Sequence, residues 1–162
     1  MPSVYIETTI PSYLTAWPAK NLIAAAHQAI TREWWERRRH GFELFTSQLV
    51  IEEVFAGDDA AAQLRLGALD GIPLLTSSNS VEWIAGELER LKLVPPNAAA
   101  DGFHIAYSSV HAMGYLLTWN CRHIANAERL PAIERFLADS GFHVPIVCTP
   151  EELMGDADET DD

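Results

Sequence analysis

The sequence predicts an α/β fold in which a mainly parallel sheet lies between helices on both of its faces. Short apolar runs typical of strands alternate with longer segments of helical periodicity. The 162 residues, 48% hydrophobic and 21% charged, suit one globular domain. Because each crossover helix returns the chain to the same edge of the sheet, this alternation implies parallel strands. We expect one domain over residues 1–154 and an acidic, disordered tail over residues 155–162.

The first strand and the first long helix are predicted from side-chain spacing. Residues 3–7 alternate apolar and polar side chains and stop at a Thr-Thr-Ile-Pro-Ser turn signal, as a strand that feeds a loop does. Residues 20–40 repeat an apolar position about every fourth residue, which predicts an amphipathic helix. Its last four residues, 37–40, are basic and complement the helix dipole. This dipole interaction explains the basic run about as well as contact with RNA does.

Two β-α units follow. The apolar run 42–45 is followed by a Thr-Ser pair that can cap a helix over residues 48–56. A third run, 72–75, leads into another helix, where Asn79 and Glu82 have the spacing of a capping box. A Pro-Pro pair ends that helix.

The remaining elements continue the alternation. Residues 97–113 predict a helix, 115–119 a strand, 128–138 a helix and 144–148 a strand. Residues 149–152, Thr-Pro-Glu-Glu, predict a helix start with proline at the first position and glutamate at the third.

Charge and cysteine use limit the classes of function. With 11 Lys and Arg against 23 Asp and Glu, the chain is not a passive electrostatic binder of nucleic acid. Cys121 and Cys148 lack CxxC spacing and are too few for a disulfide framework, so we expect reduced thiols in a soluble, cytoplasmic protein. The N-terminus has no signal-peptide pattern, and no window has the ~20 apolar residues of a membrane span.

Several common catalytic motifs are absent from the sequence. It contains no GxGxxG, GxxxxGK[ST], GxSxG or HExxH motif, which removes the usual nucleotide, nucleophile-elbow and zincin signals. His104 and His111 stand seven residues apart on one predicted helix, too far to share a zinc ion directly. We interpret both as surface or hydrogen-bonded core histidines.

Four polar residues occupy positions where an α/β sheet places its active site. Glu7 and Asn120 close predicted strands, and the carboxyl ends of parallel strands face the binding crevice. Glu53 lies on the helix 48–56, and Asp101 lies near the start of the helix 97–113. Each also has a structural interpretation as a loop starter, solvated helix residue or first-turn acid. These residues are far apart in the sequence, so their spacing alone does not place them near one another. Whether they converge depends on the fold.

Four local motifs resemble the PIN-domain ribonucleases, in particular the VapC-like toxins of bacterial toxin-antitoxin pairs. Residues 4–9, VYIETT, resemble the opening strand with the first acid, and residues 47–54, SQLVIEEV, the helix with the second. Residues 101–106, DGFHIA, resemble the third-acid motif, and residues 118–126, TWNCRHIAN, the segment of a fourth acid or its amide substitute. The resemblance spans nearly the whole chain and implies a three-layer PIN-like fold.

The resemblance implies a metal-dependent nuclease site. Glu7, Glu53 and Asp101 would hold Mg²⁺ or Mn²⁺ on carboxylate oxygens, with Asn120 as a fourth catalytic residue. The sequence departs from the family at Glu7, which is usually Asp, and at Asn120, which is often Asp. Three negative charges favour one firmly bound ion over two. Glu53 and Glu52 both remain candidates for the second acid, and we choose Glu53 because an aliphatic residue follows it.

The resemblance also implies substrate contacts and partners. Thr8, Arg122 and His123 would bind the RNA, whose phosphodiester bonds the ion would help to cleave. The expected partners are the RNA substrate, a small antitoxin protein and a second copy of the chain in a homodimer, with no membrane. The alternative is a catalytically weakened PIN-like module retained for protein binding, with an exposed tryptophan among Trp17, Trp34 and Trp35 as an anchor.

Overall fold

A parallel sheet forms the middle of the computed structural model, which describes residues 1–156. Its strand order is β3-β2-β1-β4-β5, and all four strand pairs are parallel. The strands are β1 (Ser3–Ile6), β2 (Glu43–Ser47), β3 (Leu74–Leu75), β4 (Tyr115–Leu117) and β5 (Ile146–Cys148). The predicted α/β class with a parallel sheet is confirmed.

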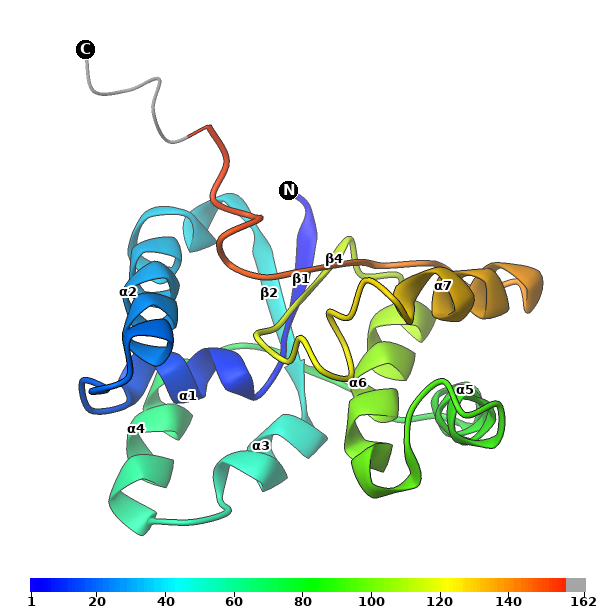
Figure 1. The fold of residues 1–162 in the computed structure, drawn as a ribbon, viewed down its shortest axis with the longest axis horizontal. Helices are drawn as coiled ribbons and strands as arrows, with labels where there is room; N and C mark the ends of the chain where they lie inside the picture. Colours follow the sequence, from blue (N-terminus) through cyan, green and yellow to red (C-terminus); the bar gives the residue numbers. More distant parts are fainter. Residues whose placement is uncertain (157–162) are drawn as a thin grey trace.

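Helices cover both faces of the sheet. They are α1 (Thr9–Thr15), α2 (Leu22–Arg37), α3 (Gln48–Val54), α4 (Asp59–Leu69), α5 (Asn79–Arg90), α6 (Ala99–Val110) and α7 (Leu130–Asp139), with short 3₁₀ turns at Arg39–Gly41 and Pro96–Ala98. From β1 the chain moves outward to β2 and β3, then returns to the other side of β1 for β4 and β5. Right-handed crossovers in opposite directions place their helices on opposite faces. Figure 1 shows α1, α2 and α4 on one side and α5, α6 and α7 on the other.

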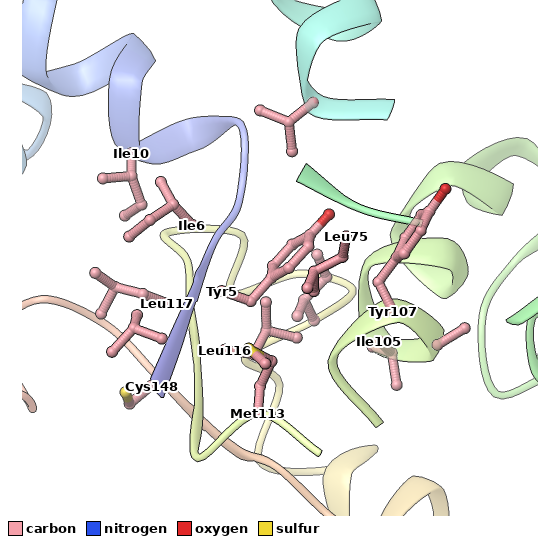
Figure 2. Close-up of a cluster of buried hydrophobic side chains, with 14 of the residues drawn as sticks. Tyr5, Ile6, Ile10, Leu75, Ile105, Tyr107, Met113, Leu116, Leu117 and Cys148 are labelled. Carbon is pink, nitrogen blue, oxygen red and sulfur yellow. The ribbon is translucent and has the colours of Figure 1, made fainter. Parts of the chain in front are cut away.

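Side chains of β1 alternate between the two halves of the core. Tyr5 and its neighbour Leu116 on β4 face α6, whereas Ile6 and its neighbour Leu117 face Ile10 of α1 (Figure 2). All five side chains are fully buried. The reversal of direction at β1 makes its carboxyl end the switch point of the sheet, where ligands bind in open α/β folds.

Two helices are missing from the sequence prediction. Residues 9–15 have the composition of a turn, yet they form α1, because Pro11 lies in the first turn, where its missing N–H costs no hydrogen bond. Helix α4 has a weak apolar pattern and is capped by Asp58, whose carboxylate accepts a hydrogen bond from the N–H of Ala61.

The two predicted helix caps differ in outcome: the one at Asn79 is wrong by one residue, and the one at Thr149 is confirmed. Ser78, one residue before Asn79, caps α5 by accepting a hydrogen bond from the N–H of Val81. Thr149 and Glu152 form the reciprocal contacts of a capping box, but only one turn follows them.

Three further expectations concern the cysteines, membrane-spanning helices and the C-terminal tail. Cys121 and Cys148 are free thiols. Within residues 1–156 no helix combines the length and hydrophobicity needed to cross a bilayer. Most of the predicted tail, residues 157–162, lies outside the described residues.

Candidate functional site

The Glu7 carboxylate is fixed between the ends of β1 and β4. Glu7 follows β1 directly and is 3% exposed. Its Oε1 accepts hydrogen bonds from the backbone N–H of Thr9 at 3.1 Å, from the Thr9 hydroxyl and from the Thr118 hydroxyl at 2.7 Å. Because Ile6 pairs with Leu117, the sheet register brings Glu7 and Thr118 together.

The Glu53 carboxylate lies beside the same turn. Its Oε1 accepts hydrogen bonds from the Thr8 hydroxyl at 2.7 Å and from Nε2 of His104 at 2.6 Å. Helix α3, which carries Glu53, begins directly after β2 with Ser47 as its cap. Glu52, the alternative candidate, is exposed and lines a cavity between α3, the end of β3 and α6, to which Glu53 does not contribute. The structure therefore places Glu53, and not Glu52, in contact with Thr8, the residue that follows Glu7.

Burial and hydrogen bonding act in opposite directions on Glu53. Burial raises the pKa of its carboxyl group, but the hydrogen bonds with His104 and Thr8 outweigh this effect. The pKa of Glu53 is therefore lower than usual, which favours the ionised carboxylate at neutral pH. Hydrogen bonding, and not repulsion between carboxylates, determines the direction of this shift.

His104 connects Glu53 to the core. It is 0% exposed, and its Nδ1 lies 2.7 Å from the Tyr5 hydroxyl. The same hydroxyl lies 2.7 Å from Oγ of Ser47. Burial raises the pKa of the Tyr5 hydroxyl well above its usual value, so Tyr5 remains a protonated phenol.

Asp101, His123 and Asn120 form the third part of the site. Asp101 lies in the first turn of α6, and its Oδ2 lies 3.0 Å from Nδ1 of His123. The Asn120 side chain accepts a hydrogen bond from the His123 backbone N–H at 3.0 Å. The Asn120 backbone N–H in turn donates to Oγ1 of Thr118 at 2.9 Å.

These contacts join the four candidate residues into one cluster at the carboxyl end of the sheet. From Asp101 the contacts run through His123, Asn120 and Thr118 to Glu7. Thr8, the next residue, binds Glu53. Segments separated by up to 111 residues thus meet at the switch point of the sheet.

No protein-family model and no curated protein matches this chain.

The carboxylates suit a hard divalent cation in type and charge. Glu7, Glu53 and Asp101 each use one carboxylate oxygen for hydrogen bonds to described residues and leave the other without one. Oε2 of Glu7 makes no hydrogen bond to residues 1–156, and it is not fully buried. Oxygen ligands are the ones that Mg²⁺ and Mn²⁺ prefer. Across those residues, however, no three His, Cys, Asp or Glu side chains are close enough together to form a metal site as they stand.

The three predicted RNA-binding residues differ in position. Thr8 and His123 belong to the cluster through their contacts with Glu53 and Asp101. Arg122 is exposed, and its guanidinium makes no hydrogen bond or ion pair with the described residues. It is free to contact a ligand but is not oriented by the site.

Sequence reasoning did not assign a functional role to His104 or Tyr5. The interpretation of His104 as a hydrogen-bonded core histidine is confirmed, since both ring nitrogens have partners. Their spacing from the candidate acids along the chain could have indicated that both residues lie near the site. His104 follows Asp101 by three residues on α6, and Tyr5 precedes Glu7 by two on β1, so both pairs share a face of their element.

Proposed function

We propose that this chain is a divalent-metal-dependent endoribonuclease of the PIN-like type and the toxin of a toxin-antitoxin pair. The observation that carries the proposal is the cluster itself. Glu7, Asp101 and Asn120 come from three separate segments and are linked by contacts through Thr118 and His123. Glu53, from a fourth segment, binds Thr8, the residue after Glu7, at the same switch point of the parallel sheet. The structural roles of a loop starter, a solvated helix residue or a first-turn acid would not require all four residues to lie at one place.

The chain's own residues would supply the ligands and orient the substrate. Glu7, Glu53 and Asp101 would hold Mg²⁺ or Mn²⁺ on their free oxygens, with a side-chain movement that brings those oxygens together. The ion would supply an activated water and offset the charge that develops on the phosphate. Asn120 holds the loop that carries His123. The neighbouring Arg122 would bind the phosphate.

Cleavage of RNA by an Asp101→Asn variant tests the proposal. The purified protein should cleave single-stranded RNA with Mg²⁺ or Mn²⁺ and not with a chelator. Asp101→Asn should abolish cleavage and keep the fold, because Asn can still contact His123. Asp139→Asn, at the exposed end of α7, is the matched control and should leave cleavage unchanged. Metal-dependent cleavage by Asp101→Asn at the wild-type rate would overturn the assignment.

An exposed apolar surface supports a protein partner. Trp17 is 90% exposed, and Leu22, Ile23 and Leu64 are also exposed. Trp17 and Leu64 line a cavity of about 300 Å³ between the end of α1 and the start of α4. A helix of a small antitoxin would cover this surface with its own apolar face. Trp34 and Trp35 are buried in the core and are not such anchors.

The second candidate is a protein-binding module with weakened catalysis. It is favoured by the structural role of the Glu7 carboxylate, which accepts two hydrogen bonds from Thr9 at the start of α1 and one from Thr118 after β4. A calorimetric titration with Mn²⁺ separates the two functions. Binding that disappears in Asp101→Ala supports the nuclease, and no binding by the wild-type protein favours the module.

A further inference from the structure

Behind the Glu53 carboxylate lies a row of polar side chains that leads into the core. It runs from Ser47 through Tyr5 and His104 to Glu53, and its three contacts measure 2.7, 2.7 and 2.6 Å. Ser47, Tyr5 and His104 are all 0% exposed. They come from the end of β2, from β1 and from α6. The row therefore connects Glu53 to fully buried residues of three different elements.

The hydrogen atoms of this row can be placed by counting donors and acceptors. Oγ of Ser47 accepts from the backbone N–H of Val50, so its own proton points to Tyr5, its other partner among the described residues. The Tyr5 hydroxyl then donates to Nδ1 of His104. The single ring proton of a neutral imidazole must consequently sit on Nε2, where it is donated to Glu53.

The reverse arrangement leaves a buried group unpaired. If Nδ1 of His104 donated to Tyr5, the Tyr5 proton would be given to Ser47. The Ser47 proton would then have no acceptor in a fully buried position, which is unfavourable. In a neutral ring, Nε2 would also carry a lone pair directed at the Glu53 carboxylate. Only the first arrangement satisfies every member of the row.

We propose that Tyr5 and His104 are positioning residues for Glu53, which hold the imidazole as the Nε2–H tautomer and so fix one carboxylate oxygen while the other stays free. This proposal rests on the proposed function, because it concerns the same carboxylate. Partners behind a metal-binding side chain orient it in this way in many metal sites, and their loss typically weakens binding or activity by about 10- to 100-fold.

A double-mutant cycle tests the positioning role. Tyr5→Phe keeps the ring that stacks on Tyr107 and removes only the hydroxyl. We expect about tenfold losses in Mn²⁺ affinity and in kcat, with KM for RNA unchanged. His104→Gln keeps an N–H donor for Glu53, and His104→Ala, which does not, should lose more. In the His104→Gln background, Tyr5→Phe should have no further effect, since Tyr5 acts only through the ring.

Additive effects of the two substitutions, or an unchanged Mn²⁺ affinity and kcat in folded Tyr5→Phe, would overturn the proposal. Thermal unfolding of each variant shows whether it is folded. His111→Gln is the matched control. Its ring also donates a hydrogen bond from Nε2, to the carbonyl of Thr76, but lies outside the row.

The tautomer can be measured without any activity. Long-range ¹H–¹⁵N spectra of the imidazole should show only the Nε2–H form of His104 in the wild type and in His111→Gln. In Tyr5→Phe, where Glu53 alone still favours this form, a minor Nδ1–H form should become detectable. An Nδ1–H form in the wild type would refute the proposal. If the wild-type protein neither cleaved RNA nor bound Mn²⁺, the proposed function would fall, and these spectra would still decide whether Tyr5 sets the His104 tautomer.

Discussion

Nε2 of the fully buried His104 lies 2.6 Å from Oε1 of Glu53, whose side chain is 32% exposed. The contact joins the rigid interior of the protein to the surface of the candidate site. It also distinguishes Glu53 from its neighbour Glu52, which lines a cavity that Glu53 does not reach. Two adjacent glutamates on one short helix thus have different surroundings.

Glu53→Gln should remove nuclease activity, whereas Glu52→Gln should not. The amide keeps the size of the side chain but loses the negative charge that a cation needs. The loss should exceed the roughly 10- to 100-fold typical of residues one step further from the ion. Initial rates of RNA cleavage for the two variants, compared side by side, provide the measurement. Equal losses in both variants would show that the assignment of Glu53 is wrong.

Glu53 should also make the stability of the protein depend on pH. Burial acts to raise its pKa, but the contacts with His104 and Thr8 lower it overall. A carboxyl group with a lowered folded-state pKa stabilises the fold above its unfolded value, near 4.3 for glutamate, and this contribution is lost as the pH falls through the folded value. The effect should be small, because the exposed part of the side chain is screened by solvent.

Between about pH 5 and about pH 3, the wild type should therefore lose more stability than Glu53→Gln. Urea unfolding at several pH values gives the two curves. Parallel curves over this range would contradict the predicted shift.

Thr118→Val should affect both stability and activity. The Thr118 hydroxyl donates to Glu7 and accepts from the backbone N–H of Asn120, and it is fully buried. Valine keeps the shape and leaves both partners without this bond, at a cost of about 1–3 kcal/mol. Ser109→Ala is the control, because this buried hydroxyl donates to the carbonyl of His143 away from the cluster. Unfolding and cleavage assays should show that only Thr118→Val reduces activity.

Alkylation should distinguish the two cysteines. Burial, with a smaller contribution from Glu152, raises the pKa of the Cys148 thiol to about 12, and this residue lies in β5. Cys121 is exposed. Iodoacetamide should modify Cys121 in the native protein and Cys148 only after unfolding, as read by mass spectrometry. Rapid native modification of Cys148 would contradict its place in the sheet.

The sequence predicts the architecture well because strand and helix periods alternate clearly from β1 to β5. It does not predict α1, since Pro11 looks like a turn residue until its position in the first helical turn is known. The candidate acids can be selected by motif, but the choice between Glu52 and Glu53 depends on how α3 is rotated against β1. The role of Thr118 depends on the register of β1 with β4, which is a tertiary property.

The partners of His104 could not be predicted for the same reason. Tyr5 lies 99 residues away in the chain and Glu53 lies 51 away. Only the packing of α6 and α3 around β1 brings these three residues together.

A crystal structure with Mn²⁺ tests the central claim most directly, because anomalous scattering locates the ion. We predict one strong peak within about 2.0–2.6 Å of oxygens from Glu7, Glu53 and Asp101, the range for hard divalent cations. A Mn²⁺ ion bound elsewhere, or these three carboxylates unchanged at saturating Mn²⁺, would contradict the account.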